Sequence, residues 1–399
     1  MDNIEEKTTK KSKKGLAIVL AIIIIAALVG GYFLTKSSNP KNVFVSQINK
    51  TLDNYGTEYK KISDKINSTV TLTANIDAKE GSDVAQMSEY VNNSKLTLNV
   101  QADTANKKFL MAADVDYKNE NFLNGKVYYQ NGEDNIYVYV EDLFDKYFKI
   151  DLSQVYDEEE LQQFKNLAEQ NMGQKIDFEK ISKILKQEID SNFKDEYFSK
   201  ETVDGMTKNT MKLTVKEWKT VLTNIITNLK NNQEYLNSFS NADEQKKYLE
   251  DALEMIKEID EENATTEISI FTKGFNSEFV KLEMKVTEDN KEEALVVVEK
   301  QDDSNFAFTV KDDEDEVKGT VKVEKQGNSM KLTVATEEIP DFGKLTLNID
   351  SKMEETTSID SVDVSNSIDV NNMSQEDMLT LYTNLTKMKI YSLLGGFLQ

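Results

Sequence analysis

Hydrophobic and polar residues alternate through two long parts of the chain, residues 70–150 and residues 265–350. In each run the apolar side chains share one parity, and Lys, Thr or Glu fill the other. In the second part, turn residues recur about every ten to twelve positions. This pattern predicts short antiparallel strands with one buried face and one face mostly in water.

The apolar spacing changes to that of helices between these two groups. Residues 176–193 and 242–259 each carry one apolar stripe, and an acidic first turn at Asp157 to Glu160 opens another helix. Thr214 and Glu217 have the spacing of a capping box, which predicts a helix start there. Ser374 and Asp377 have the same spacing and are predicted to cap the C-terminal amphipathic helix. We therefore place central helices at 157–260, inserted between the two groups of strands.

A run of apolar and small residues without charge extends from Gly15 to Leu34. About 20 such residues in a helix match the roughly 30 Å hydrocarbon core of a bilayer. Lys10, Lys11, Lys13 and Lys14 stand just before the run, and only Lys36 and Lys41 follow closely, so the positive-inside rule predicts a cytoplasmic N-terminus. The sequence predicts a single-pass protein of the plasma membrane whose main domain is extracellular.

The predicted layout follows from these segments. It comprises a basic cytoplasmic tail at 1–14, a transmembrane helix at 15–35, a linker and amphipathic helix at 36–66, an extracytoplasmic β-rich domain at 67–350, and a polar linker with a C-terminal amphipathic helix at 351–399. The fold class is α+β: the transmembrane helix plus an antiparallel curved sheet or half-barrel.

Composition narrows the chemistry. Acidic residues outnumber basic ones by 71 to 48, for a net charge of -23, so nucleic acid is not an expected partner. Cysteine and histidine are both absent, which removes thiolate sites, a lipidated Cys and the commonest acid/base group. Paired carboxylates alone would suffice for a glycosidase, but no pair stands out among so many acids. We expect that the protein is not an enzyme and that it binds no cofactor and no metal.

Two local features are candidates for sites. The acidic run from Asp312 to Glu316 could supply oxygen ligands to Ca²⁺, but a solvated hairpin turn explains it better. Aromatic residues gather in the first group of strands, where amphipathic rings can line a ligand mouth, although strand preference for Tyr accounts for them as well. The ligand-lining candidates are Tyr128, Tyr137, Tyr139, Phe148 and Trp218.

The order of elements resembles the half-barrel of bacterial envelope lipid carriers of the LolA and LppX type. It consists of strands, inserted helices and further strands in an exported, tethered chain. The resemblance covers roughly Thr69 to Asp350 and rests on element order; the composition is similar to that of low-GC Gram-positive bacteria. In that group, helices close the concave side of the sheet over an apolar cavity that holds acyl chains. This chain departs from the group by its spanning helix and its greater length.

Two functions follow as hypotheses. The first is a non-enzymatic binding protein that holds an apolar or lipid-like ligand; the second is a structural or assembly adaptor of the cell envelope, acting through protein contacts. The apolar end of the chain, Leu393 to Leu398, is expected to dock on the chain's own domain, with the membrane surface or another subunit as alternatives.

Overall fold

The structure is a computed structural model. It describes residues 39–60, 65–82, 84–103, 105–130, 133–158, 160–161, 177–239, 241–259, 263–274, 278–289, 291–312, 315–339 and 342–388, without the side chains of 54–60 and 86. The predicted cytoplasmic tail, the span at 15–35 and the apolar end at 393–398 lie outside these residues. No helix in the described part of the chain is long and apolar enough to cross a bilayer.

One curved, open sheet of 16 strands organises the described residues. Its order is β16-β6-β5-β4-β3-β2-β1-β15-β14-β13-β12-β11-β10-β9-β8-β7, antiparallel throughout except for the β16–β6 pair. The strands are β1 (Lys65–Ala78), β2 (Ser94–Asp103), β3 (Lys108–Tyr117), β4 (Glu120–Gln130), β5 (Asn135–Val140), β6 (Phe148–Asp151), β7 (Phe198–Val203), β8 (Met206–Thr214), β9 (Ala264–Lys273), β10 (Glu278–Glu288), β11 (Lys291–Lys300), β12 (Asn305–Asp312), β13 (Glu316–Gln326), β14 (Ser329–Thr336), β15 (Gly343–Glu355) and β16 (Ile368–Asp369).

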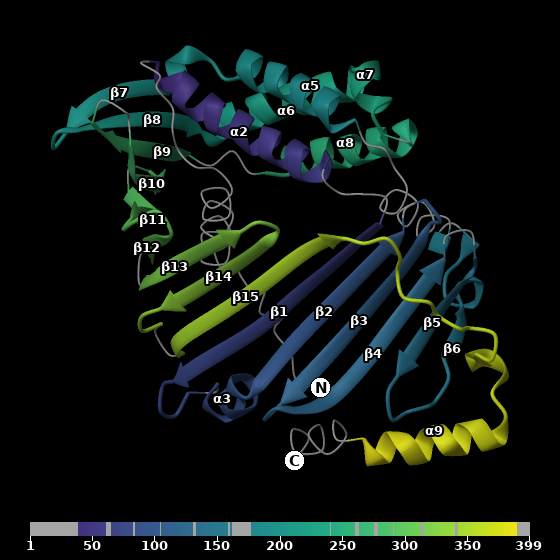
Figure 1. Ribbon diagram of the computed structural model, residues 1–399. Helices are drawn as coiled ribbons and strands as arrows, with labels where there is room; N and C mark the ends of the chain where they lie inside the picture. The colour runs from purple at the N-terminus through teal and green to yellow at the C-terminus, as the bar shows by residue number, and fades with distance from the viewer. Residues whose placement is uncertain are drawn as a thin grey trace, which may run out of the picture.

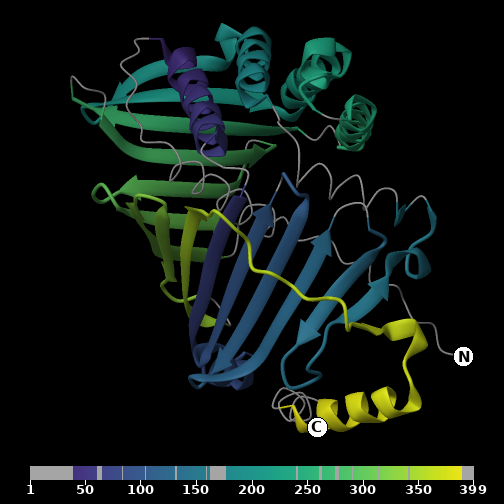
Figure 2. The same cartoon turned by 45° about the vertical axis from the view of Figure 1, so that its right-hand side comes forward.

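The helices of the described residues are α2 (Pro40–Lys60), α3 (Ala85–Asn92), α5 (Phe178–Asn192), α6 (Val215–Asn231), α7 (Gln233–Leu236), α8 (Ala242–Lys257) and α9 (Gln375–Lys387). Four of them, α2, α5, α6 and α8, form a layer at the β7–β9 end of the sheet (Figures 1 and 2). Away from this layer, α3 lies against β1, and α9 lies near the loop between β5 and β6. The predicted α+β class with a curved antiparallel sheet is confirmed.

Local sequence signals set several element ends as expected. Thr214 and Glu217 form the predicted capping box of α6, and Ser374 with Asp377 forms the equivalent box of α9. Asp204 and Gly205, both with positive φ, make the turn between β7 and β8. The predicted helix at 43–66 ends earlier, because α2 stops at Lys60 and Lys65 already belongs to β1. Helix α3 was not predicted.

The main hydrophobic core lies between the helix layer and strands β8 to β13. Leu213 and Val221 are each 1% exposed, and they meet Val43 and Phe44 of α2 within one cluster. The apolar parity of the strands supplies the other side of this core, with Val296 fully buried. A second cluster joins α5, α6, α7 and α8 to one another. The helix layer is thus bound tightly to one end of the sheet.

Replacing Leu213 by Ala should lower the free energy of unfolding by about 2–5 kcal/mol, because the cavity left at this site has little freedom to collapse. Urea titration followed by fluorescence of the single tryptophan, Trp218, reports directly on this cluster. The matched control is Leu379→Ala on α9, where the side chain is 68% exposed and little should change. Equal losses in the two variants would contradict the assignment of the core.

Candidate functional site

One face of the sheet is apolar well beyond the strands that the helix layer covers. The register places Leu72 of β1 opposite Leu96 of β2 and Ile349 of β15, and Leu96 opposite Val115 of β3. Side chains of this parity stay only half-buried on β15, β1, β2 and β3. We call this region the open face; it consists of Val70, Leu72, Leu96, Leu98, Met111, Val115, Leu347 and Ile349.

The helix layer does not extend over the open face. Its closest approaches to the sheet are those of α2 to β7 and β8, and of α6 to β8 and β9. Among the described residues, α3 is the helix that packs against this part of the sheet, through β1. A contiguous, half-exposed apolar surface on a folded protein generally marks a place where something binds.

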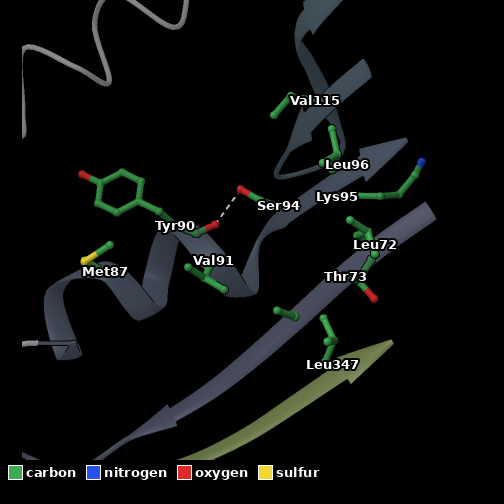
Figure 3. A pocket seen from close by; sticks show the side chains of 11 residues that line it. Leu72, Thr73, Met87, Tyr90, Val91, Ser94, Lys95, Leu96, Val115 and Leu347 are labelled. Atoms are coloured by element: carbon green, nitrogen blue, oxygen red, sulfur yellow. Dashed lines mark hydrogen bonds between the residues drawn. The ribbon is translucent and has the colours of Figure 1, made fainter. Parts of the chain in front are cut away.

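Helix α3 forms a pocket at one end of the open face. The pocket has a volume of about 330 Å³ and is lined by residues of α3, β1, β2, β3 and β15 (Figure 3). Leu72, Leu96, Val115 and Leu347 come from the strands, and Met87 comes from α3. The lining is almost entirely apolar, so the pocket is suited to hydrocarbon rather than to a charged group.

Backbone pairing explains why α3 sits there. Strand β1 pairs with β2 only as far as Thr73, which is opposite Lys95, so the rest of β1 lacks a β2 partner. The amide of Asn92, at the end of α3, donates to the carbonyl of Ile76 at 2.9 Å and accepts from its backbone amide. Ser94 Oγ donates to the Tyr90 carbonyl at 2.7 Å, which closes the last turn. The helix therefore replaces a strand along the end of β1.

The opposite face of the same strands is polar and is crossed by a segment from near the end of the chain. The register places Asn67, Thr69, Asn99 and Gln101 on this face, where Asn99 donates to Asn67 Oδ1 at 2.6 Å and to Thr69 Oγ1 at 3.0 Å. Residues 356–367, which we call the strap, lie across this face in an extended form (Figures 1 and 2). The two faces of the sheet therefore differ in both chemistry and cover.

The strap is held by a reciprocal pair of hydrogen bonds. The Asp360 amide donates to Gln101 Oε1 at 2.7 Å, and Gln101 Nε2 donates to Asp360 Oδ2 at 2.9 Å. Val362 and Val364 of the strap pack on Leu110 and its aromatic neighbours. The strap then continues into β16, which pairs with the edge strand β6. The stretch that the sequence predicts to be a polar linker therefore also contributes an edge strand.

Lys65 links the start of the strap to a buried carboxylate. Its Nζ lies 3.3 Å from Asp103 Oδ2 and donates to the Thr357 carbonyl at 3.1 Å. Asp103 is 4% exposed and also accepts from the Asn106 amide at 3.0 Å and from Asn106 Nδ2 at 2.8 Å. Burial would raise the pKa of Asp103, but the hydrogen bonds from Asn106 and Lys65 outweigh it, so the pKa is lowered.

The structure brings three of the five predicted ligand-lining residues together, on the strap side of the sheet. Tyr128 and Tyr137 are cross-strand neighbours with ring centroids 6.1 Å apart, and Tyr139 shares their face, 5.4 Å from Tyr147. Val362 and Val364 pack against the cluster that contains Tyr128 and Tyr137, and burial raises the pKa of both phenols. Their contact with a ligand stays a prediction.

The other two predicted residues lie apart from this cluster. Phe148 is opposite Val138 and so faces the other side of the sheet, where it makes an edge contact with Phe144 at 5.1 Å. Trp218 belongs to the core under the helix layer, 5.8 Å from Phe193. Sequence reasoning missed the pocket under α3, although Met87, Tyr90 and Val91 have the i, i+3, i+4 spacing of a helix face.

The acidic residues do not gather around a metal in the described part of the chain, where no group of three or more potential ligands meets. Asp312 and Asp315 instead shape the turn between β12 and β13. The Asp315 amide donates to Asp312 Oδ1 at 2.9 Å, and the Asp312 amide donates to the Asp315 carbonyl at 3.0 Å. These bonds are those of a tight turn.

Comparisons with known proteins establish no family. No family model matches the sequence, and no curated protein is similar to it. A porin-like protein from Bacteroides uniformis is 6% identical with a TM-score of 0.17, covering 72% of this chain and 96% of that chain. A mutant of Transferrin Binding Protein B from Haemophilus parasuis is 9% identical with a TM-score of 0.13, and the match covers 73% of this chain and 76% of that chain. The MucA/MucB complex of Pseudomonas aeruginosa is 6% identical with a TM-score of 0.09, and the match covers 73% of this chain and 94% of that chain. Such low TM-scores support no conclusion about function.

Replacing Asp103 by Asn should destabilise the protein at neutral pH by about 1–3 kcal/mol, because Lys65 loses its charged partner in a mostly buried site. The pKa of Asp103 is lower in the folded protein than its ordinary value of 3.8. The contribution of the charged carboxylate to stability is therefore complete above pH 3.8 and is lost as the pH falls through the pKa of the folded state. The difference between wild type and variant should therefore shrink toward pH 3 in urea titrations.

The control for this prediction is Glu89→Gln, which removes an exposed partner of Lys118 and should leave stability nearly unchanged at every pH. A difference between wild type and Asp103→Asn that stays constant from pH 7 to pH 3 would show that the charge of Asp103 does not contribute.

Proposed function

We propose that this protein is a membrane-anchored, extracytoplasmic binding protein that holds an apolar, lipid-like ligand on the open face and in the pocket under α3. The observation that carries the proposal is the half-buried apolar surface of β15, β1, β2 and β3, which continues into that pocket. A ligand lying there removes further hydrocarbon from water, at roughly 25 cal/mol for each Å².

The shape and chemistry of the surface favour a linear hydrocarbon chain. The apolar side chains follow rows across neighbouring strands, and one such row, formed by Leu72, Leu96 and Val115, lines the pocket. Lys95 borders the pocket, but its side chain points away from α3 (Figure 3) and pairs with Asp116 at 2.9 Å. An acyl chain needs no charged partner at such a site.

The ligand position differs from that in the lipid-carrier fold suggested by the sequence. There, helices cover the concave side above the cavity, whereas here α2 and α6 pack directly on β7 to β9 and share a filled hydrophobic core with the strands. The available apolar surface is the part of the sheet beyond the helix layer. The proposed ligand therefore binds beside the helices, under α3.

A binding role fits the chemistry better than a catalytic one. The chain has neither His nor Cys, and its sequence carries no phosphate loop, nucleophile elbow or dinucleotide fingerprint. The polar groups of the opposite face are engaged with one another or with the strap, as Gln101 is with Asp360. Solubility outside the membrane is consistent with the net charge of -23.

One observation favours the adaptor function as a second candidate. Helix α9 exposes Met378, Leu379, Tyr382 and Leu385, which lie within two turns on one side of the helix. Such a stripe fits a groove on another protein. The open face comprises eight apolar side chains and continues into a pocket, so ligand binding remains the first function.

A fatty acid that carries a photoreactive diazirine should label the open face when it is added to the full-length protein in lipid nanodiscs. Mass spectrometry of the digested protein should place the label in peptides covering residues 94–115 and 345–349. Leu96→Gln, at the wall of the pocket, should lose most of this label because a polar amide then faces the hydrocarbon.

The matched control is Thr97→Gln, which changes the next residue of β2 on the opposite face and should keep the label. Labelling that is confined to residues 15–35, or that is equal in the two variants, would contradict a ligand site on the open face.

Topology is tested separately. Protease added to protoplasts should degrade residues 39–388, because the lysine asymmetry places the span with its N-terminus inside. Replacing Ile23 and Ile24 by Lys should abolish stable anchoring, since each central charge disfavours insertion by roughly 2.5–3.5 kcal/mol. Protection of the whole chain in intact protoplasts would contradict this orientation.

A further inference from the structure

We infer that the pocket under α3 is the docking site of the chain's own apolar segment, residues 389–399, which follows α9. These residues lie outside the described part of the chain, and the inference rests on where α9 ends, on the reach of the segment, and on the chemistry of the pocket. It adds an intramolecular occupant to the pocket and does not depend on an external ligand.

Helix α9 is fixed at the edge of the sheet, which determines where the segment begins. Asn384 Nδ2 donates to the Leu143 carbonyl at 2.9 Å, in the loop between β5 and β6. Met388, the last described residue, is 7% exposed and caps the helix through its backbone amide. The segment therefore starts from a defined point rather than from a free helix.

The direction of α9 points the segment toward the pocket. The helix enters from the β6 side and runs along the edge of the sheet, so its C-terminal end faces the end where α3 lies (Figures 1 and 2). Residues 389–399 can span at most roughly 36 to 40 Å when extended. Met87, which lines the pocket, is 50% exposed, so the pocket can be reached from outside at this residue.

The chemistry of the segment matches that of the pocket. Its large apolar residues are Ile390, Leu393, Leu394, Phe397 and Leu398, and the two glycines at 395 and 396 allow a sharp bend between Leu394 and Phe397. A volume of about 330 Å³ is at the low end of the roughly 300–1,000 Å³ of small-molecule sites, so the pocket accepts a few such side chains. Only Lys389 in the segment is a charged side chain.

Intramolecular docking is favoured over a second copy because the tether keeps the segment near the pocket at a high effective concentration. Under the proposed function, the segment and an acyl chain would compete for the same side chains.

Disulfide trapping tests the inference in the full-length protein, because the chain has no cysteine of its own. The test variant carries Met87→Cys and Phe397→Cys, and the matched control carries Glu89→Cys and Phe397→Cys. Met87 lines the pocket, whereas Glu89 lies two residues away on the same helix and pairs with Lys118 at 3.0 Å. Both positions are exposed and are equally within reach of a free segment.

Mild oxidation, followed by peptide mass spectrometry, should show an intramolecular 87–397 disulfide forming at least about tenfold faster than the 89–397 disulfide, because docking raises the local concentration at one face of α3. Similar rates for the two pairs would mean that the segment does not dock and would overturn the inference. Disulfides between chains in place of the intramolecular product would assign the pocket to a second copy and would also overturn it. No lipid probe is involved, so this result is independent of the labelling experiment.

Discussion

The antiparallel pairing of β1 with β15 makes a single sheet from strands that are far apart in the sequence. Thirteen consecutive register pairs, from Ile66 with Glu355 to Ala78 with Gly343, join the first group of strands to the last. Closing a loop of this length is entropically costly, but the cost grows only slowly with length and is offset by the long ladder and its buried side chains. Without this pairing, the strap and α9 would not be brought to the first group of strands.

A sheet of this width cannot be covered by the helices that the described residues provide. The helix layer packs on β7 to β9, and Leu213, Val221 and Val296 belong to the core cluster that begins there and continues along the strands to β13. The same parity continues on the other strands, because the period of two is kept from one ladder to the next. The open face is thus the direct result of a continuous sheet and an incomplete helix layer, and the proposed ligand site follows from that mismatch.

The C-terminal residues use both faces of the sheet edge. The strap crosses the polar face, where Gln101 and Asp360 exchange hydrogen bonds and Lys65 joins Asp103 to Thr357. Helix α9 then lies along the edge and points back toward α3. One segment of chain therefore covers the tyrosine-rich side of the sheet and then, as α9, points toward the end of β1 where α3 lies.

The sequence by itself determined the elements whose signals are local. Alternation identified the strands of both groups, and the Thr214–Glu217 and Ser374–Asp377 boxes marked two helix starts, because caps and periodicity depend on residues within one or two turns. It also identified the tyrosines of β4 and β5, of which Tyr128 and Tyr137 are in contact. What only the tertiary structure decided was which strands the helices cover, that Phe148 and Trp218 lie apart from those tyrosines, and that α3 forms a pocket with Leu72, Leu96 and Leu347. These features depend on the pairing of β1 with β15 and on the packing of distant segments, and neither is encoded in the spacing of neighbouring residues.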